Sequence, residues 1–490
     1  MEYLSTRGCT EKHSASLAVI KGLADDGGLF VPERIPRLEA SVKDLVGKSY
    51  KEIAFEVLKL YFTDYTEAEL KSCIDNAYDS KFDTELIAPL VKRGDQYFLE
   101  LFHGRTIAFK DMALSILPHL LTCALAKNNI REKVIIMTAT SGDTGKAALE
   151  AFADVENTKI IVFYPKGGVS RIQERQMVTQ KGANTKVVGV KGNFDDCQSA
   201  VKRMFSDKEL NYELAGKGYR FSSANSINIG RLFPQVAYYV YAYVKMVEDG
   251  AISDGEPLNF TVPTGNFGNI LAAFYAKNMG IPIGKLICAS NENKVLYDFF
   301  RTGTYDKNRD FILTTSPSMD ILISSNLERL IYHSLGNDAA ENAGLMKKLA
   351  ETGRYSVDGT SREFMKDFVG IYATEDEVRE TIKYVYESCG YVIDTHTAVA
   401  AYADRKYKSS DSNVSVVVST ASPYKFMASV LDAIDAGKVS DDDFAMAEEL
   451  SALSKVDIPK AVSSLKDAAI LHDTVCAVDE MNGEVRKFLD

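Results

Sequence analysis

The sequence is poor in the residues that cross-link small proteins or bind metals. Its 490 residues include seven cysteines and six histidines. The cysteines are odd in number and form no Cys-x-x-Cys pair, which indicates reduced thiols in a cytosolic protein, mostly packed as small apolar side chains. The histidines are dispersed without metal-ligand spacing, so we predict no metal site.

Long apolar segments and long basic runs are also missing. The longest mostly apolar stretch, 114–126, contains Pro118 and His119 and is too short to span a bilayer. The first residues lack the apolar region of a signal peptide. The formal net charge is −11. We therefore expect neither nucleic acid nor a membrane as a partner, and an anionic substrate would need a local cluster of cations.

The composition is that of an ordinary globular protein, with 46% hydrophobic and 26% charged residues. A chain of this length can bury a large core without cross-links. We predict four regions from changes in the sequence pattern. These are a mainly helical N-terminal region (1–95), an α/β domain (96–255), a larger α/β domain with a helical insertion (256–438) and a charged helical C-terminal extension (439–490).

Short, continuously apolar runs alternate with helical patterns through the middle of the chain. The runs lie at 134–137, 160–164, 187–190, 259–262, 286–289 and 414–418. Strands of this kind predict open parallel-type sheets covered by helices on both faces. Ligands of such sheets bind at the carboxyl ends of the strands, on the loops that follow the runs.

Lys110 stands in a run with few other polar side chains, between Phe109 and Asp111. Burial would make this amine easier to deprotonate, and a neutral amine can attack the aldehyde of pyridoxal phosphate. The segment alone better fits a lysine at the start of an amphipathic helix that reaches out to solvent. Four further polar stretches favour the first interpretation.

The loop Pro263-Thr264-Gly265-Asn266-Phe267-Gly268-Asn269 lies between an apolar run and a helical pattern. Its two glycines allow backbone amides to approach an anion, and the following helix adds partial positive charge. This arrangement suits the phosphate of a cofactor. The alternative is a plain tight turn.

A second loop of this type contains Ser141, Asp143 and Thr144. A nucleotide-binding P-loop is excluded, because Thr140 stands where that motif requires glycine and Ala147 where it requires serine or threonine. Small hydroxyl groups at a helix N-terminus suit a carboxylate, such as that of an amino acid.

Two more polar stretches complete the pattern. Asn225, Ser226 and Arg231 could together bind a phosphate group, with Arg231 as a forked donor. The alternative is a helix cap next to a surface arginine. Thr420 follows the last apolar run, where its hydroxyl could bond a pyridine nitrogen or simply cap the end of the strand.

Together with segments 3–8 and 22–29, these stretches resemble the threonine synthase family, pyridoxal-phosphate enzymes of the tryptophan-synthase-β-like (type II) fold. The resemblance covers nearly the whole chain, as far as residue 426. It implies that Lys110 forms the Schiff base with the cofactor. By the same resemblance the phosphate of the cofactor is bound by Gly265, Asn266, Phe267, Gly268 and Asn269, its pyridine nitrogen by Thr420, the substrate carboxylate by Ser141 and Thr144, and the substrate phosphate by Asn225, Ser226 and Arg231.

The sequence departs from the family pattern at two positions. Arg105 stands where the family often has proline, and it could meet the substrate phosphate or face solvent. Asp143 stands where many relatives of this fold carry an asparagine that contacts the phenolic oxygen of the cofactor. The partner of that oxygen therefore stays open.

The resemblance implies conversion of O-phospho-L-homoserine and water into L-threonine and phosphate, by a monomer or a homodimer. One alternative is an eliminating enzyme of the same fold, such as a serine/threonine dehydratase or a phospholyase. A second alternative is a non-catalytic protein that has kept the fold.

Overall fold

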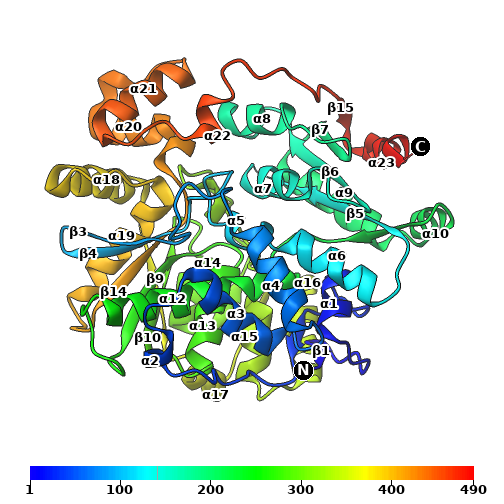
Figure 1. Ribbon diagram of the computed structural model, residues 1–490, viewed down its shortest axis with the longest axis horizontal. Helices are drawn as coiled ribbons and strands as arrows, with labels where there is room; N and C mark the ends of the chain where they lie inside the picture. The colour runs from blue at the N-terminus through cyan, green and yellow to red at the C-terminus, as the bar shows by residue number, and fades with distance from the viewer. Residues whose placement is uncertain (141, 490) are drawn as a thin grey trace.

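The computed structural model describes residues 1–140 and 142–489 (Figure 1). The smaller of its two main sheets contains β5 (Lys133–Ala139), β6 (Thr158–Pro165), β7 (Thr185–Lys191), β8 (Tyr219–Ser222) and β15 (Val475–Ala477). Their order is β15-β7-β6-β5-β8, and every pairing is parallel. The helices of this part are α7 (Asp143–Phe152), α8 (Arg171–Val178), α9 (Phe194–Ser206), α10 (Lys208–Gly216) and α23 (Met481–Leu489).

The larger sheet contains β3 (Leu90–Arg93), β4 (Gln96–Glu100), β9 (Leu258–Pro263), β10 (Ile283–Ser290), β13 (Phe368–Tyr372) and β14 (Ser415–Ser419). Their order is β13-β10-β9-β14-β4-β3. The antiparallel β3–β4 pair makes this sheet mixed, while its other pairings are parallel. The predicted α/β class is therefore confirmed, with one sheet parallel and one mixed.

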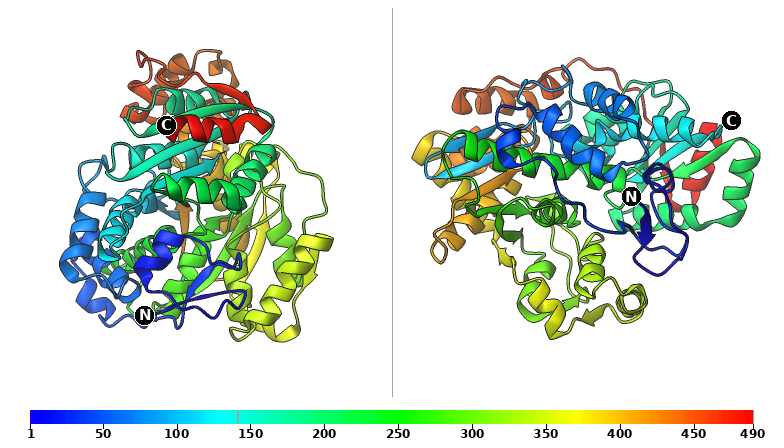
Figure 2. Two further views of the ribbon diagram at one scale, coloured as in Figure 1. Left: turned by 90° about the vertical axis from the view of Figure 1, so that its right-hand side faces the viewer. Right: turned by 60° about the horizontal axis from the view of Figure 1, so that its bottom comes forward.

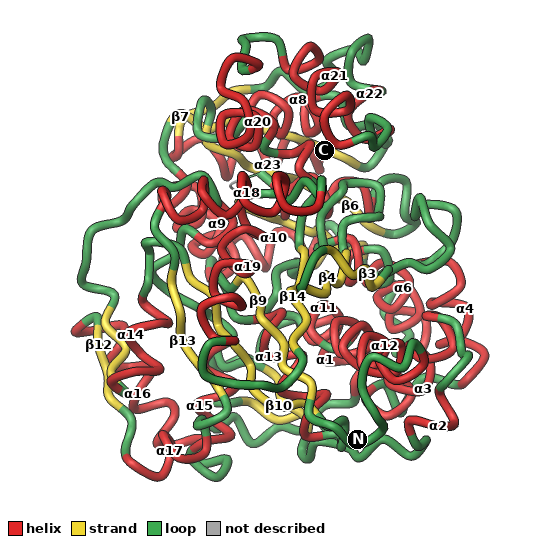
Figure 3. Tube along the Cα trace, turned by 90° about the vertical axis from the view of Figure 1, so that its left-hand side faces the viewer, coloured by secondary structure: helices red, strands yellow, loops and turns green. Residues whose placement is uncertain are grey.

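Helices cover both faces of the larger sheet. Alternate residues of β14 enter different cores, because Val416 and Val418 belong to one buried cluster and Val417 to another. Figure 3 shows α19 (Thr395–Lys408) lying across β9 and β14 on the second face. The other helices packed around this sheet are α12 (Pro234–Glu248), α13 (Gly268–Asn278), α14 (Val295–Thr302), α18 (Glu375–Cys389) and α20 (Met427–Asp435).

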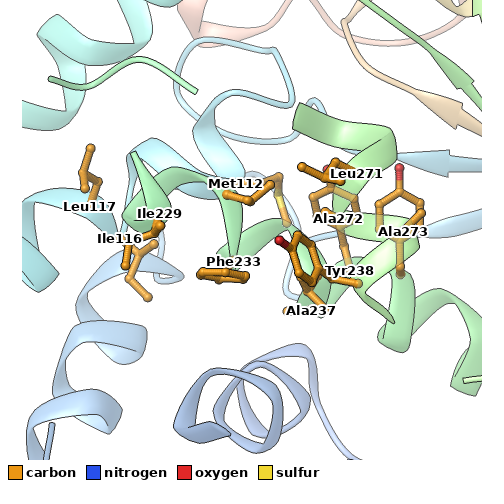
Figure 4. Close-up of a cluster of buried hydrophobic side chains, with 14 of the residues drawn as sticks. Met112, Ile116, Leu117, Ile229, Phe233, Ala237, Tyr238, Leu271, Ala272 and Ala273 are labelled. Carbon is orange, nitrogen blue, oxygen red and sulfur yellow. The ribbon is translucent and has the colours of Figure 1, made fainter. Parts of the chain in front are cut away.

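The N-terminal region supplies α1 (Ala15–Lys21), α2 (Val42–Leu45), α3 (Tyr50–Tyr61) and α4 (Glu67–Ala77), and α5 (Asp111–Leu114) and α6 (Leu117–Lys127) follow beyond residue 95. Capping boxes begin α3 at Ser49 and α4 at Thr66, within the region predicted to be mainly helical. Figure 4 shows Met112 of α5 beside Phe233 and Tyr238 at α12, in the largest buried cluster. This cluster gives the loop before α5 a rigid base.

The first residues pack on a helical segment far along the chain. The antiparallel pair β1 (Tyr3–Ser5) and β2 (Phe30–Pro32) lies near α15 (Leu327–Ser334), as Figure 2 shows. Arg7 forms an ion pair of 2.8 Å with Glu328, which also accepts a hydrogen bond from Thr6. The same segment carries β11 (Thr304–Asp306), α16 (Ala339–Thr352), β12 (Arg354–Ser356) and α17 (Gly359–Phe364).

Short strands also lie in regions that we expected to be mainly helical, among them β13 and β15. Both are short edge strands with residues that stay partly exposed. The C-terminal region also contains α21 (Asp443–Ser454) and α22 (Lys460–Ser463). The short helix α11 (Ile229–Leu232) directly precedes α12 and is buried. No helix in the described part of the chain is long and apolar enough to cross a membrane. The limits of the four predicted regions stay predictions.

Candidate active site

Lys110 lies beyond the carboxyl ends of β4 and β14, on a loop that pairs with the residues after β14. The backbone N–H of Phe109 donates to the Thr420 carbonyl at 2.8 Å, and that of Ser422 donates to the Ile107 carbonyl at 3.0 Å. Ile107 adopts a left-handed φ of 52° at the bend of this loop. The backbone thus brings together Lys110 and Thr420, two predicted site residues more than 300 positions apart in the sequence.

Asp111 fixes the shape of the same loop from inside. Its carboxylate accepts hydrogen bonds of 2.7 Å from both the backbone N–H and the hydroxyl of Thr106. A Cβ on Gly104 would lie 2.5 Å from the Asp111 Cβ, so only glycine leaves room for this packing. Burial raises the pKa of Asp111 to about 6.

The amine of Lys110 is enclosed, and the residue is only 8% exposed. Its Nζ lies 3.4 Å from Asp143 Oδ2 and 3.3 Å from Ser318 Oγ. Burial lowers the pKa of Lys110, and the charges of Lys425 and Arg231 act in the same direction, while Asp143 opposes them. The surroundings therefore shift the equilibrium towards the neutral amine that attack on an aldehyde requires.

Asp143 connects three elements at the bottom of the site. Its Oδ1 forms an ion pair of 2.6 Å with the fully buried Lys425 and accepts a hydrogen bond of 3.0 Å from Gln173. Although burial disfavours the carboxylate, the charges of Lys425 and Lys110 hold the pKa of Asp143 well below its usual range. Lys425 and Gln173 were not predicted from the sequence, because neither stands near Asp143 in a motif.

The 3₁₀ turn Pro317–Met319 closes another side of the site. The backbone N–H of Ser318 donates to His396 Nε2 at 3.1 Å, and His396 Nδ1 lies 2.8 Å from Asp394. Because Nε2 accepts, Nδ1 carries the hydrogen and donates to Asp394. Ser318 and His396 were also missed, because neither belongs to one of the motifs singled out from the sequence.

The loop at Gly265 approaches this turn closely. A Cβ on Gly265 would lie 2.6 Å from the Ser318 carbonyl oxygen. Phe267 has a left-handed φ of 62°, and α13 begins at the next residue. The side-chain oxygen of Asn269 accepts hydrogen bonds from Tyr238 and Tyr239, whereas its buried Nδ2 has no partner in the described structure. An anion bound here would meet a helix N-terminus and an unpaired amide donor.

Arg231 is buried within the site with no carboxylate beside it among the described residues. Its Nη1 donates to the Ala224 carbonyl at 2.9 Å, and its Nε has no hydrogen-bond partner there. Burial lowers its pKa to about 10. An isolated buried cation is costly, so an anionic ligand would compensate its charge.

Asn326 joins the two loops that were predicted to bind phosphate groups. Its Nδ2 donates to Ser226 Oγ at 3.0 Å and to the Asn266 carbonyl at 2.9 Å. On the other side of Ser226, Asn225 accepts a hydrogen bond of 3.5 Å from Thr138, at the end of β5. The polar stretches of the sequence therefore meet in one place.

Three remaining predictions have different outcomes. Thr144 lies partly buried in the first turn of α7, and Ser141 lies outside the described residues. The side chain of Arg105 is 52% exposed and pairs with Glu150 at 2.9 Å. Arg105 therefore faces solvent and a carboxylate, which disfavours the interpretation that it binds a substrate phosphate.

Comparison with known proteins identifies the family. The model described as "Threonine synthase N terminus" matches residues 2–78, "Pyridoxal-phosphate dependent enzyme" matches 92–421, and "Threonine synthase, C-terminal" matches 397–475. A threonine synthase of Pseudomonas aeruginosa is 39% identical over 437 residues, 88% of this chain and 90% of that protein. The chain belongs to the threonine synthase family of pyridoxal-phosphate-dependent enzymes.

Other members of the family extend the comparison. Human threonine synthase-like 1 is 41% identical over 462 residues, and the match covers 90% of this chain but 61% of that protein, so the chain spans about three fifths of that relative's length. A solved structure of pyridoxal-phosphate-bound threonine synthase from Brucella melitensis has a TM-score of 0.86 at 37% identity, covering 100% of this chain and 99% of that one. The predicted type II fold is thereby confirmed.

The residues of the site fit the cofactor of this family. The amine that would carry it is buried, and the loop at Gly265 leads into a helix N-terminus where the Asn269 amide has no partner among the residues that the structure describes. Glycine at 265 keeps the backbone accessible where a side chain would collide with the turn at Ser318.

Proposed function

We propose that the chain converts O-phospho-L-homoserine and water into L-threonine and phosphate, with pyridoxal phosphate as cofactor. One observation carries the proposal. The buried amine of Lys110 lies close enough to Arg231, a buried cation with no carboxylate beside it among the described residues, for the charge of Arg231 to lower the pKa of Lys110. A reactive amine next to an unpaired guanidinium suits an amino acid that also carries a phosphate group.

In this proposal the predicted residues divide into cofactor and substrate groups. Lys110 would hold the cofactor covalently, the backbone and side chains of 265–269 its phosphate, and the Thr420 hydroxyl its pyridine nitrogen. When bound, the cofactor supplies an electron sink that stabilises negative charge on carbon atoms of the substrate. Arg231, Ser226 and Asn225 would bind the substrate phosphate, and Thr144 with Ser141 its carboxylate.

Lys110 also moves the protons that the reaction requires. Its amine takes the proton from the substrate Cα and transfers protons among Cα, Cβ and Cγ as phosphate leaves Cγ and water adds at Cβ. Burial lowers the pKa of this amine, which makes it easier to deprotonate and so to act as a base. Arg231 keeps its charge at that pH and stays paired with the departing phosphate.

The test is incubation of the purified chain with pyridoxal phosphate and O-phospho-L-homoserine. We expect L-threonine and phosphate in equal amounts, and no product from Lys110→Ala. Phosphate release with a keto acid in place of threonine would instead indicate a dehydratase or a phospholyase. A protein with neither turnover nor visible cofactor absorbance would indicate a non-catalytic relative.

We further propose a cytosolic protein that acts as a monomer or a homodimer. The structure describes all seven cysteines as free thiols, which supports a reducing compartment. Sedimentation of the cofactor-bound protein would distinguish the two oligomeric states.

A further inference from the structure

Asp143 lies between two lysines and shares its two oxygen atoms between them. Oδ1 lies 2.6 Å from the Nζ of Lys425, and Oδ2 lies 3.4 Å from the Nζ of Lys110. The shorter contact is a charge-assisted hydrogen bond, and the longer one is at the limit of hydrogen bonding. Asp143 is therefore bonded mainly to Lys425.

Burial and a second hydrogen bond fix the amine of Lys425 next to Asp143. Its side chain is 0% exposed, and its Nζ also donates to the Thr106 carbonyl at 3.1 Å. Thr106 in turn is fixed by two hydrogen bonds to Asp111 on the Lys110 loop. The ion pair thus attaches the start of α7 to the Lys110 loop through fully buried contacts.

The other charged groups of this region have partners of their own. Lys146 lies 3.3 Å from Glu150 and donates to Gln180, and Arg105 also pairs with Glu150. The carboxylate of Asp111 is bonded to Thr106, and Arg231 adds a positive charge near Lys110. Asp143 is consequently the carboxylate that decides whether Lys110 keeps its proton.

We propose that Lys425 is a positioning residue that neutralises Asp143, so that Asp143 orients the amine of Lys110 without holding it in the ammonium form. This inference rests on the proposed function, in which the amine must lose its proton to solvent before it attacks the aldehyde of the cofactor. Lys425 itself touches neither the cofactor nor the reacting atoms in this account. Its effect passes through Asp143.

The experiment measures how fast the full-length chain takes up pyridoxal phosphate as a function of pH, followed by visible absorbance. Only the neutral amine reacts, so the midpoint of the rate profile follows the pKa of Lys110. Lys425→Met leaves Asp143 with Lys110 as its cationic partner, and we expect the midpoint to rise by about 1 pH unit or more. Asp143→Asn should move it in the opposite direction, because the repulsion from Lys425 remains.

Three further variants separate charge from structure. The double variant Asp143→Asn with Lys425→Met removes both charges and should return the midpoint to within about 0.5 unit of the unmodified chain. Lys425→Arg keeps the charge and should shift it little. Lys146→Met removes another buried lysine one turn along α7 and should leave it unchanged.

The outcomes distinguish this inference from the function on which it rests. If the unmodified chain forms no covalent cofactor adduct on Lys110, both fail. If it forms the adduct but Lys425→Met leaves the midpoint unmoved, or the double variant shifts it as far as Lys425→Met does, only the role of Lys425 fails. Should Lys425→Met not fold, an unchanged midpoint in Asp143→Asn would equally overturn it.

Discussion

Arg231 is a buried side chain with unused hydrogen-bond donors that a ligand could fill. Its guanidinium is buried with one carbonyl partner and an unpaired Nε, so part of its hydrogen-bonding capacity is unused in the described structure. Arg231→Ala should weaken the binding of O-phospho-L-homoserine by about 100-fold, since hydrogen bonds to a charged group contribute about 2–3 kcal/mol. An unphosphorylated analogue should bind nearly as before.

Inhibition constants of the two compounds provide the comparison. Arg105→Ala is the matched control, because that arginine is half-exposed and pairs with Glu150, and we expect a change below about threefold. Equal weakening of both compounds by Arg231→Ala would exclude Arg231 from the phosphate site.

His103 controls the pH dependence of stability near the Lys110 loop. Although burial opposes it, hydrogen bonds to Asp83 at 2.6 Å and Glu100 at 2.9 Å raise its pKa to about 9. Because the pKa of His103 is higher in the folded protein than in the unfolded chain, the protonated imidazole stabilises the fold. This stabilisation is fully present below the unfolded pKa of about 6.5 and is lost as the pH rises through about 9. Allowing for screening at the exposed Asp83, the loss is about 2 kcal/mol.

Urea unfolding at about pH 6 and about pH 9.5 measures this loss. His103→Asn cannot carry the charge, so its free energy of unfolding should fall about 2 kcal/mol less between the two pH values than that of the unmodified chain. An identical pH dependence in both proteins would show that His103 is not the titrating group.

Among single residues, the sequence indicates the reactive ones better than the ones that support them. Lys110 and Arg231 were singled out because their local sequences are unusual. Lys425, Ser318 and His396 were not, because their roles come from contacts with residues about 80 to 320 positions away. Such contacts arise only when the two sheets are placed together.

Among the elements, the strand–loop–helix units were the most predictable part. The runs that became β5, β6, β7, β9, β10 and β14 were recognised because they are buried on both faces and therefore continuously apolar. The strands β3, β4, β8, β13 and β15 of the two main sheets were not predicted. Of these, β8, β13 and β15 are edge strands with partly exposed residues, and β4 mixes Gln96 and Glu100 with apolar side chains.

Gly265 tests how the loop before α13 is packed. Gly265→Ala would place a Cβ 2.6 Å from the Ser318 carbonyl, and a backbone group cannot move aside as a side chain can. We expect a loss of about 1–3 kcal/mol in the free energy of unfolding and weaker binding of pyridoxal phosphate. Urea unfolding and a cofactor titration measure the two effects.

Gly344→Ala is the matched control, because it adds the same methyl group in an exposed position of α16 where nothing lies within 4 Å. It should stabilise the protein by about 0.5–1 kcal/mol. A Gly265→Ala protein as stable as the unmodified chain, with normal cofactor affinity, would contradict the close packing at Ser318.

In the whole molecule, each sheet combines strands from distant parts of the chain. The larger sheet places β14 next to β4, and the smaller sheet ends in β15, almost 300 residues after β7. The order of the runs along the chain gives no sign of this pairing. Parallel strands are joined through long connections, so their neighbours are set by how the helices pack rather than by local sequence.

Deleting residues 475–490 should therefore damage the smaller sheet. The deletion removes the partner of β7 and the side chains of Cys476, Met481 and Val485 from a buried cluster that also contains Val188. We expect thermal unfolding at a lower temperature and faster amide exchange in β6 and β7, with little change in β9 and β10. Uniform exchange changes in both sheets would contradict this division.

The central claim is that one buried amine, on Lys110, carries the cofactor. Borohydride reduction of the cofactor-bound protein, followed by peptide mapping, tests it most directly. The account predicts a single reduced pyridoxyl adduct, on Lys110, and none in Lys110→Ala. A reduced adduct on any other lysine, or no adduct at all, would contradict it.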